Sequence, residues 1–307
     1  MSIASLEAQS AEQVMAKNGR SFYFASLIFS SEQRQQVSQL YRICRYVDDC
    51  ADELSPAESK HAMHRIVTEL NDSSIDSEFQ GFMKALEKQG VKREYLAELV
   101  KGALFDIDSG QIASRDELLV YCYRVAGVVG LMMCPLLGVK DRKASSFAID
   151  LGIGMQLTNI CRDILEDAQN GRNYLPTDEL QQSGLSLSNI QQQSITPESL
   201  KKLVKTYLDI ADKYYNSGYQ GLAFIPLRPR VCILVAGEVY RSIGHKIRKN
   251  NYEVLERRTY LNTFQKMIVT LKTLPRLFMP SFWRPGHHLP RLHQSLLGLP
   301  GMDRKSK

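Results

Sequence analysis

A D-D-x-x-D motif near residue 50 has the residue types and spacing of a metal site. Asp48 and Asp52 lie four positions apart, so a helix would place both carboxylates on one face, together with Tyr41 and Arg45. Like charges at this spacing repel one another unless a cation lies between them. Carboxylate oxygens are ligands that Mg²⁺ prefers, and water and substrate phosphate usually complete its shell. Taken alone, the motif is more often a solvated acidic face than a metal site.

A second polar stripe, between residues 152 and 167, favours a buried site. Its members recur at spacings of 4, 3, 4 and 4 and are Gly152, Gln156, Asn159, Asp163 and Asp167. The surrounding helix is apolar, and Arg162 is the only basic residue between positions 147 and 165. Buried carboxylates must be paired or bound to a metal. Two such helices facing each other would form a carboxylate-lined cavity inside a helical bundle.

Arginines lie beside both acidic motifs. Arg45 and Arg162 belong to the two helices, and Arg172 follows the second one, in a loop that also contains Tyr174 and ends at Pro176. Acids that hold a metal, ringed by guanidinium groups that hold oxygens, suit a ligand that is itself a metal-bound phosphate. Ordinary ion pairing is the alternative for each arginine taken singly.

A run of small residues at 125–130 would allow another group to approach its helix closely. A long apolar ligand is one candidate, and plain helix packing is the other.

Helical periodicity dominates the chain and predicts an all-α fold. A capping box at Ser30 and Gln33 begins the helix that contains the first acidic motif. Further helices are expected at about 57–71, 75–89, 92–109, 114–139, 141–168, 197–221, 226–249 and 259–278. The stretch 181–196 is a polar connector, and no run of strands with hairpin turns occurs.

Composition excludes several classes of protein. The chain has 307 residues, 44% hydrophobic and 23% charged, which argues against a disordered, collagen-like or small disulfide-rich chain. The net charge of +6 is compatible with anionic ligands or a membrane surface. Six cysteines without a C-x-x-C pair predict reduced, buried thiols in a cytosolic protein. The longest uncharged stretch, 125–139, is short for a membrane span and predicts a core helix.

With these motifs in view, the sequence resembles the head-to-head prenyl synthases of the squalene/phytoene synthase family, and within it the carotenoid-pathway members. The resemblance rests on residues 20–23, 48–52, 121–130 and 156–176, and it extends over about 14–278. It implies a single all-α isoprenoid-synthase domain over 1–307 with a deep central cavity and a C-terminal tail at about 279–307. It also implies two acidic helices that bind Mg²⁺, with Mn²⁺ as a substitute.

The resemblance also assigns roles to individual residues. The implied metal ligands are Asp48, Asp52, Asn159, Asp163 and Asp167, and the four aspartates and Tyr121 are the implied catalytic residues. The implied substrate-binding residues are Ser21, Tyr41, Arg45, Gln156, Arg162, Arg172, Tyr174, Tyr240 and an arginine of the pair Arg257/Arg258, of which Arg257 is chosen. One departure is Asn18-Gly19-Arg20, where relatives often have His-Ser-Lys.

The implied reaction condenses two molecules of geranylgeranyl diphosphate head to head, through prephytoene diphosphate, to the hydrocarbon phytoene. Neither NADPH nor nucleic acid is expected to take part. The nearer alternative is a squalene, dehydrosqualene or presqualene-diphosphate synthase that uses farnesyl diphosphate. An alternative from another class is a non-catalytic membrane-interaction protein, against which the paired acidic motifs argue.

The last 36 residues differ in character from the rest of the chain. Residues 272–307 contain five prolines and seven lysines or arginines but one acid, Asp303. We therefore expect a loosely ordered basic tail on a cytoplasmic protein. Peripheral contact with membrane lipid, and with neighbouring enzymes of the carotenoid pathway, is expected as well. His287, His288 and His293 lie in this tail and receive no catalytic role.

Overall fold

The computed structural model describes residues 10–52, 54–108, 110–192 and 196–302. Helices dominate these residues, and none of them lies in a strand; a single isolated bridge joins Gln111 to Asn173. The all-α prediction is therefore confirmed.

The N-terminal part of the chain folds into helices that flank the first acidic motif. They are α2 (Ala11–Asn18), α3 (Arg20–Ser26), α4 (Ser31–Asp52), α5 (Pro56–Asn71), α6 (Glu78–Lys88) and α7 (Arg93–Asp108). One half of the predicted capping box is present at the start of α4, where the backbone N–H of Gln33 donates to Ser30 Oγ at 3.2 Å. The Gln33 side chain accepts from the Ser30 hydroxyl at 3.4 Å. The short helices α2 and α3 were not predicted, because neither is long enough to show a clear apolar period.

The middle of the chain forms two long helical segments. The first joins α8 (Arg115–Cys122), a π-helical turn η1 (Tyr123–Gly127) and α9 (Val128–Leu136) without a break, and the second is α10 (Ala144–Gln169). Both agree with the predicted ranges 114–139 and 141–168. A π-helical turn inside an α-helix is frequent at functional sites, and η1 falls within the run of small residues.

The C-terminal part continues with two long helices and several short ones. They are α11 (Thr177–Gln182), α12 (Leu187–Gln192), α13 (Glu198–Gln220), η2 (Leu222–Phe224), α14 (Leu227–Lys249), α15 (Thr263–Thr273), η3 (Leu274–Phe278), α16 (Pro280–Trp283) and η4 (Pro290–Leu296). The polar connector at 181–196 thus contains short helices, and the helix expected at 259–278 begins at Thr263.

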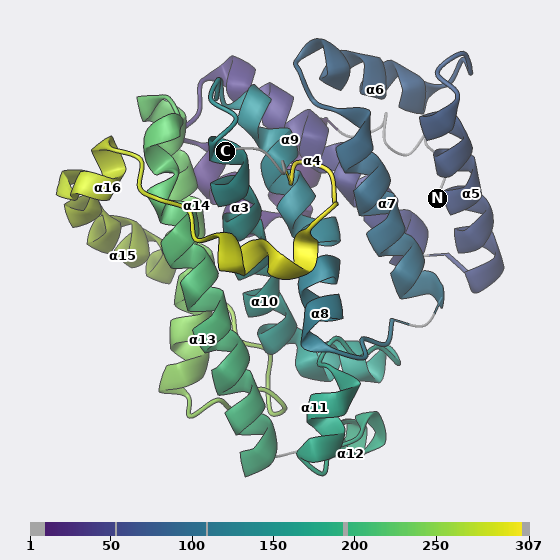
Figure 1. Ribbon diagram of the computed structural model, residues 1–307, viewed down its shortest axis with the longest axis vertical. Coiled ribbons are helices and arrows are strands. Elements are labelled where there is room, and N and C mark those ends of the chain that lie inside the picture. Colours follow the sequence, from purple (N-terminus) through teal and green to yellow (C-terminus); the bar gives the residue numbers. More distant parts are fainter. Residues whose placement is uncertain (1–9, 53, 109, 193–195, 303–307) are drawn as a thin grey trace.

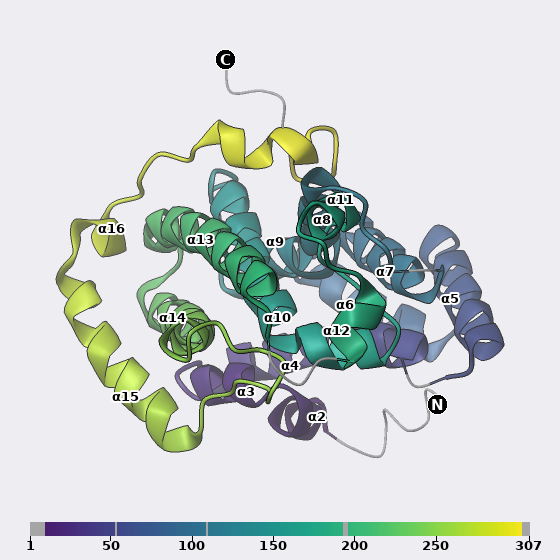
Figure 2. The same ribbon diagram turned by 90° about the horizontal axis from the view of Figure 1, so that it is seen from below.

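Helix α10 occupies the middle of the molecule, with α13 and α14 on one side and α9 and α7 on the other (Figure 2). Its apolar stripe is buried throughout, as predicted, and consists of Ile149, Ile153, Leu157, Ile160 and Ile164. Two glycines allow the segment 115–136 to approach it closely. A Cβ added to Gly130 would lie 2.3 Å from the carbonyl oxygen of Ala148, and one added to Gly152 would lie 2.4 Å from that of Ala126. Helix packing therefore explains part of the small-residue run.

The segment Arg115–Leu136 needs one correction to the sequence analysis. By length and composition it is long and apolar enough to cross a membrane, although the uncharged stretch 125–139 alone was judged too short. Half of its most apolar window is buried in the fold, and Val128, Leu131 and Met132 belong to the core. The interpretation of this segment as a core helix is confirmed.

The C-terminal segment packs against the helical bundle. It crosses the outside of the molecule past α13 and α8 (Figure 1), where Tyr214 Oη donates to the Leu292 carbonyl at 2.7 Å. Phe282 and Leu296 are buried in the hydrophobic core. The prediction of a loosely ordered tail is therefore wrong for residues 279–302, while 303–307 lie outside the described residues. A proline-rich composition does not prevent packing where a few apolar side chains are buried.

Candidate active site

A cavity of about 260 Å³ lies between α4, α10 and α14, and its other walls come from α3, η1, α9, α13 and η2. Most of the lining side chains are apolar. Along each of the three main helices the lining changes from apolar to polar in the chain direction: from Val37 to Asp48, from Ala144 to Asn159 and from Ile233 to Tyr240. The cavity therefore has a hydrocarbon-like interior and one polar end.

The small-residue run contributes to this wall. Val125, Ala126, Val129 and Gly130 all line the cavity, in addition to their packing against α10. The two interpretations of the run are thus compatible, because close packing of its glycines leaves its other side free to face the cavity.

On α4, the two outer aspartates of the motif face the polar end. Asp48 lines the cavity, and Asp52 forms an ion pair with Arg172 at 2.8 Å. The middle aspartate, Asp49, is buried and pairs with Arg45. Asp48 is open to the cavity but surrounded by protein. This enclosure raises the pKa of its carboxyl to about 7, against the opposing charge of Arg45, and nearby carboxylates raise it further.

On α10, Asp163 is held by two arginines. Arg162 binds its carboxylate in a bidentate manner, with Nε at 2.7 Å and Nη2 at 2.6 Å from the two oxygens. Arg258 Nε lies 2.8 Å from one of these oxygens. Arg258 also pairs with Glu166 at 2.9 Å. Asp167 differs, because burial and the charges of Asp163 and Glu166 raise the pKa of its carboxyl to about 7. One aspartate of this helix is thus neutralised by cations, and the other is not.

Asp106, at the end of α7, lies between the two acidic helices. It accepts hydrogen bonds from Tyr121 at 3.1 Å and Tyr174 at 2.9 Å, and the two tyrosine rings stack with centroids 4.9 Å apart. Burial raises the pKa of Asp106 to about 6, and its negative charge in turn raises the pKa values of Asp48 and Asp167. The two motifs that the sequence placed on separate helices therefore meet around this residue.

Sequence reasoning missed Asp106. The only signal was the D-I-D sequence at the end of the helix expected at 92–109, and Asp106 has no acidic partner one turn away. Its importance comes from contacts with residues far along the chain, which spacing does not reveal.

The structure brings most of the expected substrate-binding residues to the polar end. Tyr41, Gln156 and Tyr240 line the cavity, and Phe22 packs edge-on against Tyr240 with ring centroids 5.9 Å apart. Ser21 precedes Phe22 on α3. Burial raises the pKa of Tyr41 to about 12 and also raises that of Tyr240, so both phenols stay protonated and can donate hydrogen bonds to an anionic ligand.

Four other expected residues lie differently from the way the resemblance suggests. Tyr121 is buried behind Asp106 and is not among the residues that line the cavity. Arg172 and Tyr174 line a smaller pocket beside Asp167. Of the two arginines considered near the end of α14, Arg258 is the one that reaches Asp163, while Arg257 is exposed.

The donor set at the polar end fits a divalent cation. The side-chain oxygen of Asn159 is buried at the polar end of the cavity and has no hydrogen-bond partner within the described part of the chain. Leaving such an acceptor unsatisfied is costly, and a cation would satisfy it. Asp48 and Asp167, which form no ion pair with a described arginine, supply further oxygens of the kind that Mg²⁺ accepts.

Comparison with known proteins identifies the family. The family model described as squalene/phytoene synthase matches residues 15–265. The 15-cis-phytoene synthase of Pantoea ananas is 33% identical over 278 residues, which cover 85% of this chain and 89% of that protein. The phytoene synthase of Thermus thermophilus is 32% identical and covers 89% of this chain and 93% of its own length.

Solved structures agree on the fold. A dehydrosqualene synthase crystallised with a ligand superposes with a TM-score of 0.79 at 25% identity, over 87% of this chain and 95% of that one. A squalene synthase from Alicyclobacillus acidocaldarius superposes with a TM-score of 0.69 at 21% identity, over 80% of this chain and 96% of its own.

Proposed function

The chain belongs to the squalene/phytoene synthase family, and we propose that it is a phytoene synthase, a prenyltransferase of carotenoid biosynthesis. Its substrate class is a prenyl diphosphate, and the proposed substrate is geranylgeranyl diphosphate, two molecules of which condense head to head. The observation that supports this most directly is the cavity, with an apolar interior and a polar end built from both acidic helices. An isoprenoid tail and a diphosphate head need those two environments.

The residues at the polar end would bind the diphosphate. Arg162, Arg172 and Arg258 are fixed there by carboxylates, and guanidinium groups bind phosphate oxygens through paired hydrogen bonds. Tyr41 and Tyr240 add neutral donors. These fixed positive charges favour departure of diphosphate from the first substrate, because they stabilise the charge that develops on the leaving oxygens.

Divalent-metal dependence is general in this family, and the proposed ion is Mg²⁺ or Mn²⁺. Its ligands would be Asp48, Asp52, Asn159, Asp163 and Asp167. When bound, such an ion would supply further neutralisation of the departing diphosphate.

The apolar wall would guide the carbon skeleton. Departure of diphosphate leaves an allylic cation, the double bond of the second substrate attacks it, and loss of a proton closes the cyclopropane of prephytoene diphosphate. A second ionisation, rearrangement and proton loss would give phytoene. Val125, Ala126 and Leu151 offer no nucleophile to these cations, and exclusion of water prevents their capture as alcohols. Tyr121 lies behind Asp106, so released diphosphate is the better placed proton acceptor.

Product analysis tests this proposal. Purified protein incubated with geranylgeranyl diphosphate and Mg²⁺ should form phytoene at the same rate with and without NADPH, because the proposed reaction ends in proton loss and not in hydride capture. A reduced C40 hydrocarbon that accumulated only with NADPH would contradict it. Conversion of farnesyl diphosphate alone would favour the alternative, a dehydrosqualene or squalene synthase.

We also propose that the protein works in the cytoplasm at the surface of a membrane. An exposed apolar stripe runs along α15 and η3 at spacings of 4, 3, 4, 3 and 4, and consists of Tyr260, Phe264, Met267, Leu271, Leu274 and Phe278. No acidic residue occurs between positions 260 and 283, while Lys272 is exposed on this segment. A basic, apolar surface suits anionic lipid, to which each well-placed cation contributes about 1 kcal/mol.

The position of the stripe suits release of a hydrocarbon. Helix α15 packs along α14, which lines the cavity, and Arg276 of η3 pairs with Glu238 of α14 at 3.2 Å. Beyond it, α16 packs against η2, whose Leu222 lies in the apolar part of the cavity wall. Lipid at the stripe would therefore lie beside the apolar end of the cavity, where a product that is insoluble in water needs to leave.

Vesicle sedimentation tests this surface. The double variant Phe264→Ser, Leu271→Ser should bind phosphatidylglycerol vesicles at least about 10-fold more weakly than the unaltered protein. The matched control Leu289→Ser, Leu297→Ser changes two exposed leucines outside the stripe and should bind normally. Equal binding by the stripe variant would instead assign the stripe to a protein partner, such as a neighbouring carotenoid enzyme. Point substitutions are preferable to truncation, since residues 279–302 pack against the bundle.

A further inference from the structure

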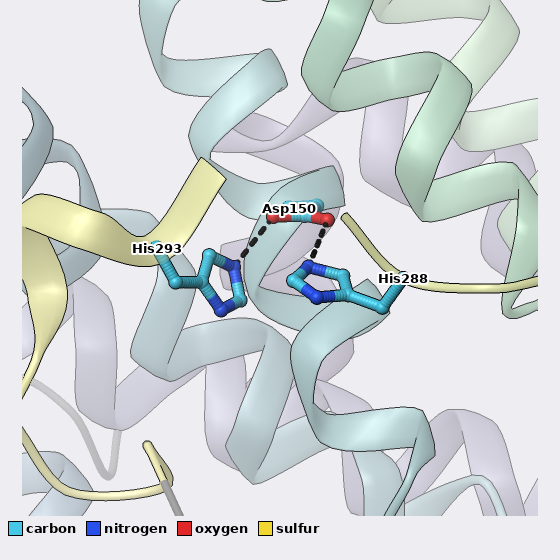
Figure 3. A group of neighbouring side chains, drawn as sticks. All are labelled: Asp150, His288 and His293. Atoms are coloured by element: carbon cyan, nitrogen blue, oxygen red, sulfur yellow. Dashed lines mark hydrogen bonds and ion pairs between the residues drawn. The ribbon is translucent and has the colours of Figure 1, made fainter. Parts of the chain in front are cut away.

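A second cluster of potential metal ligands lies on the far side of α10 from the cavity. Asp150 of α10 is completely buried, and its carboxylate faces two histidines of the C-terminal segment (Figure 3). His293 Nε2 lies 2.7 Å from one carboxylate oxygen, and His288 Nε2 lies 3.0 Å from the other. All three groups offer ligand atoms within 4.8 Å of one another.

The buried carboxylate of Asp150 has few partners. In the described part of the chain its hydrogen-bond and ion-pair partners are the two imidazoles. A buried carboxylate is costly unless a positive charge compensates it, and a metal ion bound between the three side chains would supply that charge. The surroundings offer little else, since the neighbouring groups are the ring of Phe147, which packs edge-on against His288, and the phenol of Tyr214, whose pKa the charge of Asp150 helps to raise.

We propose that Asp150, His288 and His293 bind a divalent transition-metal ion of the Zn²⁺ type. Two imidazole nitrogens and one carboxylate oxygen are ligands that Zn²⁺ accepts, whereas Mg²⁺ prefers oxygen alone. This site is therefore chemically distinct from the aspartate-rich polar end of the cavity. It is also independent of the proposed function, because no step of the condensation uses it.

The two nitrogen–oxygen distances are close to those of a metal site. A tetrahedral ion with bonds of about 2.0–2.1 Å separates its ligand atoms by roughly 3.3 Å, so each nitrogen would move away from its carboxylate oxygen by a few tenths of an ångström. The side chain of His288 is 17% exposed, which leaves access for the ion and for a water as fourth ligand. A bound ion would fasten the C-terminal segment to the helix that contains Asn159, Asp163 and Asp167.

Metal binding to the full chain tests the proposal without any activity measurement. Protein freed of metal by chelation, with no histidine tag, is titrated with Zn²⁺ in the presence of excess Mg²⁺, which occupies oxygen-only sites. One equivalent should bind, and Zn²⁺ should raise the melting temperature by roughly 3–8 °C. The double variant His288→Ala, His293→Ala should bind at least about 100-fold more weakly and lose that rise.

His287 provides the matched control, since it is an exposed histidine of the same segment. His287→Ala should bind like the unaltered protein. If the double variant does not fold, Co²⁺ added to the unaltered protein decides, because absorption of tetrahedral nitrogen and oxygen ligation without thiolate charge-transfer bands supports the site. Uptake of no Zn²⁺, or Zn²⁺ retained by a folded double variant, would overturn the proposal and leave the cluster as a hydrogen-bonded clasp.

Discussion

The two acidic helices contribute carboxylates to the same end of the cavity, but they differ in what already balances those charges. On α10, Asp163 is held by Arg162 and Arg258. On α4, Asp48 faces the cavity and forms no ion pair with an arginine among the described residues, although Arg45 lies near it, and its pKa is raised to about 7. The contrast is between two aspartates and not between whole helices, since Asp52 of α4 is paired with Arg172 and the pKa of Asp167 of α10 is also raised to about 7. Asp163 is already held in its charged form, whereas Asp48 becomes stable in its charged form only when a cation is present.

The largest expected effect is on turnover and treats both helices alike. Asp48→Ala and Asp163→Ala should each lower kcat by about 10²–10³-fold or more, because each removes charge stabilisation of the departing diphosphate. Chelation with EDTA should abolish activity, and Mg²⁺ should restore it. Full activity after exhaustive chelation would contradict the proposed role of the metal in diphosphate departure.

Stability should separate the two helices. Asp163→Asn should lower the free energy of unfolding by about 1–2 kcal/mol, because it weakens the bonds of the largely buried Arg162. Asp48→Asn should leave it unchanged or raise it at pH 8, since the folded chain disfavours the charged form of this residue. Denaturant unfolding of both variants measures the difference, and equal losses would contradict the comparison.

Loss of Asp106 should affect both helices at once. Asp106→Asn keeps an acceptor for one tyrosine but removes the negative charge that both acidic helices sense. We therefore expect kcat to fall about 10- to 100-fold, as is typical when a group that positions metal ligands is lost. A higher Mg²⁺ concentration should be needed for half-maximal activity. The conservative variant Asp106→Glu should recover part of the activity, whereas a residue with a purely packing role would not respond to the restored charge.

The pH dependence of stability gives a smaller effect with a definite sign. The pKa values of Asp48 and Asp167 are raised to about 7 from an ordinary value near 4. The folded chain therefore holds these protons more tightly than the unfolded chain, and stability falls as the pH rises from about 4 to about 7. Metal-free protein should melt lower at pH 8 than at pH 5, and Mg²⁺ should reverse most of this fall.

A matched pair of variants assigns that fall. Asp167→Asn should reduce the difference in melting temperature between pH 5 and pH 8. The control variant Asp76→Asn, at an exposed position, should leave that difference unchanged. An unchanged slope in Asp167→Asn would show that this carboxyl does not titrate in the range.

The smallest effect concerns the apolar wall. Ala236 lines the cavity from α14 and is buried. Ala236→Phe should shorten the space for the isoprenoid tail and shift kcat/KM from geranylgeranyl towards farnesyl diphosphate by about 10-fold, the usual scale of steric selection in an apolar pocket. Ala211→Ser, a buried alanine of α13 outside the lining, should leave the ratio unchanged.

The sequence predicted what depends on local periodicity. The bounds of α10, its apolar stripe and its polar stripe follow from a 3.6-residue repeat, and the start of α4 follows from the capping side chain of Ser30. Asp106 was not predicted because its role depends on a hydrogen bond from Tyr174, which lies 68 positions away in the chain. The packing of the C-terminal segment escaped for the same reason, since His288 meets Asp150 at a separation of 138 positions. Composition suggested disorder there, but a few long-range contacts decided otherwise.

The most direct test of the central claim is a competition between two substrates. Geranylgeranyl and farnesyl diphosphate, each with a different isotopic label, are supplied together with Mg²⁺ and without NADPH, and Asp163→Asn serves as the inactive control. The account predicts a C40 product identified as phytoene, formed from two geranylgeranyl units, and little C30 product. A predominance of C30 hydrocarbon, or no hydrocarbon until NADPH is added, would contradict it.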